Sequence, residues 1–168
     1  MPASEHDPAD GSVTVVVVNW NRRELLRSCL ESLAKQSVTA FEVILVDNGS
    51  ADGSAEMAES EFGACERFRL RVIRNSGNLG FCAANNQAIG ACNSEYVALL
   101  NNDAEADPGW IEALAGAFRR GDDIGMAASK ILVWEDPTRI DKAGYRHCRA
   151  CESERRAEAQ RRKKEKAA

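Results

Sequence analysis

The sequence has no apolar run approaching the roughly 20 residues that cross a bilayer. Residues 1–12, MPASEHDPADGS, have neither the basic start nor the apolar stretch of a secretory signal. We therefore expect a disordered leader there, in a cytoplasmic protein. The sequence also has no GxxxxGK[ST] phosphate loop, no HExxH zinc motif, no GxSxG nucleophile turn and no EF-hand loop. These absences exclude the commonest phosphate-loop, zinc-protease, hydrolase and calcium-binding classes.

Acidic residues outnumber basic ones outside the C-terminal end. Residues 153–168 hold seven Lys or Arg against three Glu, so the remainder of a chain with net charge −4 carries about −8. A nucleic-acid surface needs clustered positive charge, and the acidic body argues against one. We interpret residues 147–168 as a charged tail. It would be a solvated helix or a frayed end, or it would touch RNA or anionic lipid and bring the protein to the inner face of the membrane.

The six cysteines do not suggest a disulfide framework, because the chain shows no export signal. Four of them lie among apolar positions, and we interpret them as small core residues: Cys29, Cys65, Cys82 and Cys92. Cys148 and Cys151 form a lone CxxC after His147. No second ligand pair follows at the spacing of a zinc site, so metal binding there is disfavoured.

Four β-rich apolar runs alternate with helical patterns along the chain. The runs are VTVVVV at 13–18, FEVILV at 41–46, LRVI at 70–73 and EYVALL at 95–100. Each is nearly continuous, which indicates strands covered on both faces of a parallel sheet. Helical segments fill the gaps at 22–36, 54–62 and 81–92, and Leu25, Leu26, Cys29, Leu30 and Leu33 form an apolar stripe in the first. The order predicts an open α/β sheet flanked by helices, whose ligands lie beyond the carboxyl ends of the strands.

Every one of those strand ends is rich in Asn or Asp. They are Asn19-Trp20-Asn21, Asp47-Asn48-Gly49-Ser50, the segment 75–80 (NSGNLG) and Asn101-Asn102-Asp103. Each alone could be a polar turn or a helix cap. In a parallel sheet they converge on one edge, as a patch of amides and carboxylates with few positive side chains. Such a patch suits a base and a sugar, with a divalent cation to offset phosphate charge.

Asp103 is well placed for that cation. It stands where an apolar run enters a polar loop, and Mg²⁺ or Mn²⁺ binds through a few carboxylates and the phosphates of a substrate. Further along the same loop, Asp107 and Pro108 read as the N-cap and first residue of a helix through Trp110, Leu114 and Phe118.

Four segments resemble successive blocks of the family 2 glycosyltransferases, especially the rhamnosyltransferase-like members with the GT-A fold. They are VTVVVVNWNRRELLRSCLESL, FEVILVDNGSADGS, VIRNSGNLGFCAANNQAI and EYVALLNNDAEADPGWIEAL. The resemblance covers about residues 13–145, in the right order. It implies a GT-A, Rossmann-like domain at residues 13–146 that binds a UDP- or dTDP-linked sugar for inverting transfer to a polysaccharide or a lipid-linked acceptor.

The resemblance also implies roles for individual residues. Asp47 would contact the uracil or thymine base, Asn19 would lie along the nucleoside, and Asp52 would border the same pocket. The donor-lining positions are Asn78, Gly80 and Asn85. Asn101-Asn102-Asp103 replaces the acidic DxD triplet of relatives, so Asn102 would lie at the donor and Asp103 would hold the metal on the diphosphate.

The acid that acts as general base in relatives lies in a later segment, and the resemblance fades after residue 146. Glu135 and Asp136 form an acidic pair that comes too early to match it, and a turn before Pro137 is the plainer interpretation. Two alternatives stay open. One is a nucleotide-sugar-binding fragment or scaffold without transfer activity. The other is a response-regulator-like domain, disfavoured because Lys130 precedes its apolar run rather than ending it.

Overall fold

The computed structural model describes residues 12–121 and 123–143. The chain divides into two compact units, with the boundary between Ile124 and Gly125, inside the range 13–146 that the sequence suggests is one domain. The tail at 147–168, including the Cys148–Cys151 pair, lies outside the described residues, as does nearly all of the leader.

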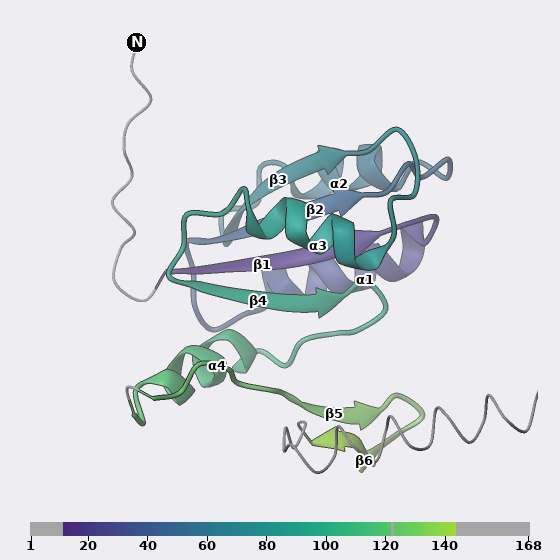
Figure 1. Ribbon diagram of the computed structural model, residues 1–168. Helices are drawn as coiled ribbons and strands as arrows, with labels where there is room; N and C mark the ends of the chain where they lie inside the picture. Colours follow the sequence, from purple (N-terminus) through teal and green to yellow (C-terminus); the bar gives the residue numbers. More distant parts are fainter. Residues whose placement is uncertain (1–11, 122, 144–168) are drawn as a thin grey trace, which may run out of the picture. The chain divides into compact units, whose positions relative to one another are not determined.

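A four-stranded parallel sheet forms the centre of the first unit (Figure 1). Its strands are β1 (Val13–Asn19), β2 (Phe41–Asp47), β3 (Phe68–Arg74) and β4 (Tyr96–Asn101), in the order β3-β2-β1-β4. Three helices connect them: α1 (Arg23–Ala34), α2 (Ser54–Phe62) and α3 (Phe81–Ile89). The predicted open α/β sheet flanked by helices is confirmed, with boundaries within about two residues for the strands.

The helices divide between the two faces of the sheet. Figure 1 shows α3 in front of β1 and β2, with α1 and α2 behind the sheet. The larger core lies on the α1–α2 face, and the smaller one contains Val16, Ile44 and Val46 with Ala84 and Ala88 of α3. The first unit therefore has a large apolar core on one face of β1 and β2 and a small one on the other.

Helix α1 buries four of the five residues of its predicted stripe: Leu26, Cys29, Leu30 and Leu33 are fully buried. Leu25 is the exception, because it lies beside Leu26 in sequence, turned away from the sheet, and remains 45% exposed.

The cysteine prediction is also wrong in part. Cys29 is buried, Cys65 and Cys92 are half-buried, but Cys82 is exposed in the first turn of α3, whose inward positions are taken by Ala84 and Asn85.

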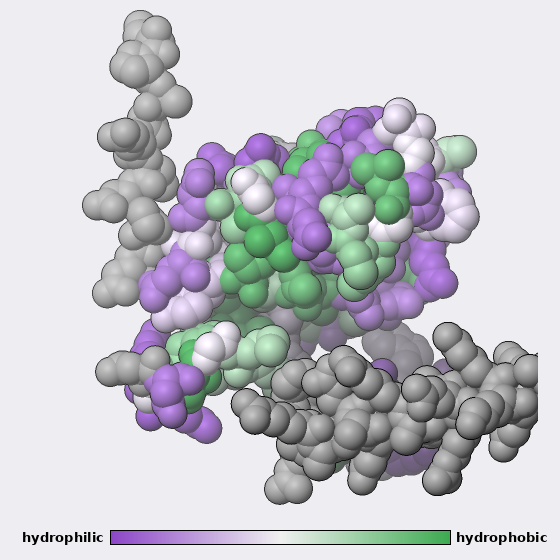
Figure 2. Space-filling model, viewed as in Figure 1, coloured by the Kyte–Doolittle hydropathy of each residue, from purple (hydrophilic) through white to green (hydrophobic). Residues whose placement is uncertain are grey.

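The expectation that all four strands are covered on both faces is wrong for the two edge strands. In strand β3 only Phe68 is buried, and the remaining residues are half-buried or exposed. In β4, Val97 and Leu99 remain exposed, Leu99 to 52%. The reason is that the face shared with α3 carries one short helix, which packs mainly on β1 and β2. Figure 2 shows apolar side chains on that face of the molecule, below the polar surface of α3.

Helix α4 (Trp110–Phe118) begins later than the sequence predicts. Pro108 and Gly109 form a turn before it, so Pro108 is not the first helical residue. The carbonyl of Pro108 accepts a hydrogen bond from the Ser37 amide (2.7 Å), which ties this residue to the loop after α1. Asp107 still accepts the amide of Gly109 (2.9 Å), a cap one turn ahead of the helix.

The second unit contains an antiparallel hairpin of β5 (Lys130–Val133) and β6 (Asp136–Ala143). Glu135 lies in its turn, as the plainer interpretation of this pair expected, whereas Asp136 begins β6 and accepts hydrogen bonds from the amide and hydroxyl of Thr138 (3.2 and 2.6 Å). In the part of the chain that the structure describes, no helix has both the length and the apolarity that a bilayer span requires.

Candidate functional site

Three of the four strand ends meet around the side chain of Asn19. Strand register sets Asn19 beside Asp47 and places Val18 beside Asn101, so the end of β1 lies between those of β2 and β4. The Asn19 amide nitrogen donates to Asp47 Oδ1 (3.3 Å), and its oxygen accepts from Asn102 Nδ2 (2.7 Å). Asn19 is 1% exposed. This asparagine therefore fixes the two flanking loops relative to each other.

Asp47 organises the loop that follows β2. Its Oδ2 accepts the Ser50 amide (2.9 Å) and its Oδ1 accepts the Ser50 hydroxyl (2.5 Å). Ser50 in turn accepts from the backbone amide of Asn21 (2.9 Å). Both Asp47 oxygens are thus bonded within the protein, and the residue is 4% exposed. The contact of Asp47 with a base stays a prediction. Asp47 would make that contact in addition to the hydrogen bonds that hold the loop.

The loop after β2 is also joined to the loop after β3. Asn48 donates to Asn78 Oδ1 (3.4 Å) and accepts from Asn75 Nδ2 (2.9 Å). The amide of Gly80 donates to Asn78 Oδ1 (2.9 Å), with Gly80 at φ +85, a conformation that favours glycine. Asn48 is 2% exposed and was not singled out from the sequence. The available signal was an asparagine directly after the strand-end Asp47.

Asn85 faces inward rather than toward the loops. Its amide nitrogen donates to the carbonyl of Phe81 (2.8 Å), one turn earlier in α3, and the residue is 6% exposed. This contact is internal to the helix. A role in lining the donor site stays a prediction for Asn85.

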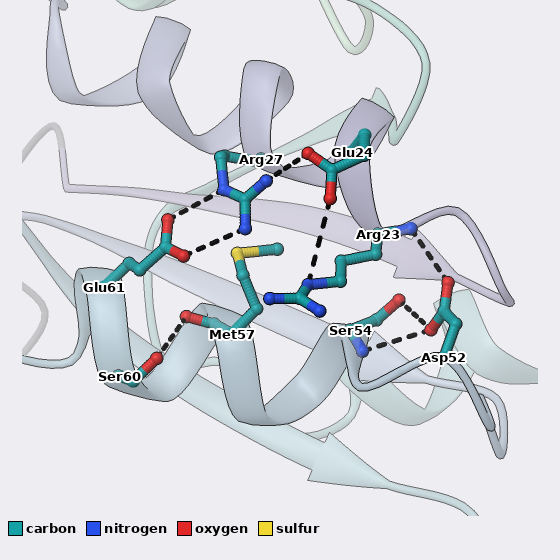
Figure 3. Close-up of polar contacts among 8 residues, drawn as sticks. All are labelled: Arg23, Glu24, Arg27, Asp52, Ser54, Met57, Ser60 and Glu61. Atoms are coloured by element: carbon teal, nitrogen blue, oxygen red, sulfur yellow. Dashed lines mark hydrogen bonds and ion pairs between the residues drawn. The ribbon is translucent and has the colours of Figure 1, made fainter.

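Asp52 joins the beginnings of α1 and α2 (Figure 3). Its Oδ2 accepts the backbone amide of Arg23 (2.9 Å), while Oδ1 accepts the amide of Ser54 (3.1 Å) and its hydroxyl. Burial would raise the pKa of this carboxyl, but the hydrogen bonds from Ser54 and Arg23 outweigh it, and the pKa lies below its usual value. Asp52 is therefore a shared cap of two helices, whatever it contacts in a ligand.

Replacing Asp52 by alanine is expected to lower the free energy of unfolding by about 1–2 kcal/mol, the usual cost of a lost helix cap. Asp52→Asn keeps an acceptor and should cost less. Urea denaturation of the three proteins measures this. Equal stability of wild type and Asp52→Ala would show that solvent replaces these bonds without loss.

The lowered pKa of Asp52 also predicts a pH dependence. A carboxyl with a depressed pKa in the folded state stabilises the protein above its unfolded pKa of about 3.9, and this contribution is lost as the pH falls through the folded value. The stability difference between wild type and Asp52→Asn should therefore be constant near neutral pH and shrink below about pH 4. A difference that grows on acidification would contradict this.

Asp103 lies in the loop after β4, with its side chain 47% exposed. Its Oδ2 is 3.0 Å from Nη1 of Arg22, in the loop after β1. The sequence predicted few positive side chains at this edge, and Arg22 is the residue that this expectation missed. The available signal was the need for a cation near the phosphates in a chain without a phosphate-loop lysine.

The described residues contain no group of three or more His, Cys, Asp or Glu side chains that could hold a metal. Burial raises the pKa of the Cys29 thiol to about 12, with Asp103 and Glu105 adding to the shift, so this nearby cysteine stays a neutral thiol. Asp103 is the carboxylate that faces solvent beside Asn102. One such carboxylate is enough for Mg²⁺ or Mn²⁺ only when substrate phosphates supply further ligands. The residues fit a metal of that kind.

The parallel sheet in the order β3-β2-β1-β4, with its polar side chains gathered at the carboxyl edge, defines an open α/β domain of the GT-A class. The chain matches the family model described as glycosyl transferase family 2 over residues 14–165. It belongs to this family. Membership excludes the response-regulator alternative.

Two curated relatives are about a third identical to this chain over the residues that match. The uncharacterized glycosyltransferase YibD of Escherichia coli is 32% identical over 115 residues, which are 68% of this chain and 32% of YibD. Glycosyltransferase GlyG of Streptococcus pneumoniae is 31% identical over 102 residues, 61% of this chain and 33% of GlyG. The chain thus spans about a third of the length of these relatives.

Solved structures show the same fold. The structure of S. aureus TarS residues 1–349 has a TM-score of 0.59 at 24% identity, covering 65% of this chain and 32% of that one. The mannosyltransferase PcManGT of Pyrobaculum calidifontis, in complex with GDP-Man and Mn²⁺, has a TM-score of 0.57 at 24% identity, covering 64% of this chain and 31% of that one. A TarS structure in complex with UDP-GlcNAc matches equally well.

Proposed function

We propose that the first unit binds a nucleoside diphosphate sugar at the carboxyl edge of its sheet, with Mg²⁺ or Mn²⁺ at Asp103. The observation that carries the proposal is the convergence of Asn19, Asp47 and Asn102 through direct hydrogen bonds, with Asp103 next in the chain. Complexes of fold neighbours with UDP-GlcNAc and with GDP-Man and Mn²⁺ support it.

Each part of the edge then has a role. Asp47 would contact a uracil or thymine base, Asn19 would lie along the nucleoside, and Asp52 would border the same pocket. On the β3 side, Asn78 and Gly80 form the donor-facing loop with Asn85 behind it. Asn102 and Asp103 face the diphosphate, where a metal held by Asp103 would supply Lewis-acid stabilisation of the departing nucleotide.

The reaction proposed for the whole protein is inverting transfer of the sugar to a polysaccharide or glycolipid hydroxyl. Such a reaction needs a carboxylate to accept the proton of the attacking hydroxyl. Glu135 and Asp136 come too early in the chain to match the base of relatives, and Asp136 accepts hydrogen bonds from Thr138, so we assign neither as the base. Because none of the described residues is assigned as the base, a nucleotide-sugar-binding module without transfer is the second candidate.

Incubation with a panel of nucleotide sugars, with and without Mn²⁺ or Mg²⁺, separates these candidates. Metal-dependent release of UDP or dTDP supports a transferase. Metal-dependent binding of UDP or dTDP in calorimetry, without release, supports the binding module. If no nucleotide binds, with either metal, the proposed function is wrong although the fold and family stand.

A further inference from the structure

Arg22 pairs with the same carboxylate that the proposed function assigns to the metal. Its Nη1 donates to Asp103 Oδ2 at 3.0 Å, and the two side chains are 52% and 47% exposed. A pair this exposed is weak, because water screens it and two long side chains must be held still. Arg22 can therefore leave Asp103 for another anionic partner at a small cost in free energy.

The backbone of Arg22, by contrast, is held in place. Asn21, at φ +52, donates its amide to the Ser50 hydroxyl (2.9 Å), and its side-chain oxygen accepts the amide of Ala51 (2.7 Å). The carbonyl of Arg22 accepts the amide of Leu26 in the first turn of α1 (2.9 Å). The backbone of Arg22 is thus anchored at the edge of the site, while its half-exposed side chain can turn.

Other arginines near the β1 and β2 loops have carboxylates elsewhere. The guanidinium of Arg27 lies between Glu24 and Glu61, on the α1–α2 surface (Figure 3). Arg23 directs its side chain to Glu24, although its backbone amide binds Asp52. Arg22 is the arginine whose ion pair is with Asp103.

The charge of Arg22 affects how tightly Asp103 would bind a metal. Asp103 paired with Arg22 is neutral overall, so it attracts a divalent cation less than a free carboxylate would, and a bound cation is repelled by the guanidinium. A diphosphate changes this balance, since its oxygens can ligate the metal and accept hydrogen bonds from arginine at the same time.

We infer that Arg22 couples metal binding to nucleotide binding. It pairs with Asp103 when no diphosphate is present, which weakens metal binding, and it turns to the diphosphate when the metal and nucleotide are bound. This inference rests on the proposed function. Arg22 is a positioning and charge-balancing residue in it, and no bond is made or broken.

The test compares Mn²⁺ affinity, from electron paramagnetic resonance of free Mn²⁺, with and without saturating UDP or dTDP. In Arg22→Gln, nucleotide-free Mn²⁺ binding should tighten about threefold, the scale of an exposed ion pair. UDP binding at saturating Mn²⁺ should weaken about tenfold, the scale of one charge-assisted hydrogen bond. The factor by which nucleotide enhances Mn²⁺ binding should fall at least threefold, and by linkage the same factor applies to UDP.

Two variants and one ligand serve as controls. Arg22→Lys keeps the charge and should lie between wild type and Arg22→Gln. Arg23→Gln removes the neighbouring guanidinium and should leave both affinities unchanged. Uridine, which has no phosphate, should bind wild type and Arg22→Gln equally.

An enhancement factor unchanged in Arg22→Gln overturns the inference while leaving the proposed function intact. Equal weakening of uridine and UDP also overturns it, because Arg22 would then support the loop rather than contact phosphate. If wild type binds neither UDP nor dTDP with Mn²⁺, the proposed function fails, and this inference fails with it.

Discussion

Metal-dependent binding of UDP or dTDP is expected to fall about 100-fold in Asp103→Asn, a loss of about 2.7 kcal/mol. The change removes the charge of the carboxylate that the proposed function assigns to the metal, while it keeps the side chain's shape. Without this carboxylate, the metal would keep only the phosphates of the substrate and neutral protein groups as ligands, and it would bind more weakly. Where transfer activity is measured, turnover should be lost together with binding.

Calorimetric titration of nucleotide with and without Mn²⁺ measures the effect. Glu105→Gln is the matched control, because it removes the same charge from an exposed position in the same loop and should leave binding unchanged. The stability of Asp103→Asn should stay within about 1 kcal/mol of wild type, since its ion pair with Arg22 is exposed. Wild-type affinity and unchanged metal dependence in Asp103→Asn would place the metal elsewhere.

Gly49→Ala is expected to destabilise the domain by about 3 kcal/mol. Gly49 has φ +76, which costs an L-residue about 1–2 kcal/mol, and overpacking costs about 1–3 kcal/mol more. An added Cβ would lie 2.7 Å from the Cα of Gly77 and 2.9 Å from its nitrogen, and backbone atoms cannot turn aside as a side chain can. The loops after β2 and β3 would have to separate.

Gly116→Ala is the matched control. Gly116 lies inside α4, and an added Cβ would meet nothing within 4 Å, so this change should add about 0.5–1 kcal/mol of stability. Urea denaturation of the two variants provides the comparison, and UDP binding should weaken in Gly49→Ala alone. A loss below about 1 kcal/mol in Gly49→Ala would show that the two loops can separate cheaply.

Much of the fold could be predicted from the sequence. The apolar runs at β1 and β2 are long and continuous because both strands are buried on both faces, and this property is local to each run. The edge strands were misjudged because an apolar run looks the same whether or not a helix covers it. Leu99 is as apolar as Leu45, yet the one is half-exposed and the other fully buried.

The candidate site could be predicted in its location but not in its connections. Asn and Asp after each strand, together with the parallel order, indicated one polar edge. That Asn19 bridges Asp47 and Asn102, and that Asp52 caps two helices, depends on pairs of residues 28 to 83 positions apart in the chain. Sequence patterns describe residues that are close along the chain, and they do not show which distant residues make contact.

The sequence by itself determined the family, the alternation of strands and helices, and the acid at the end of β4. Periodicity and strand-end chemistry are properties of short segments, so they can be read without the fold. The tertiary structure alone decided that Arg22 meets Asp103 across 81 positions, because that contact depends on β1 and β4 lying side by side. Because these two strands are paired, Asp103 forms an ion pair with Arg22 that can be exchanged for other partners.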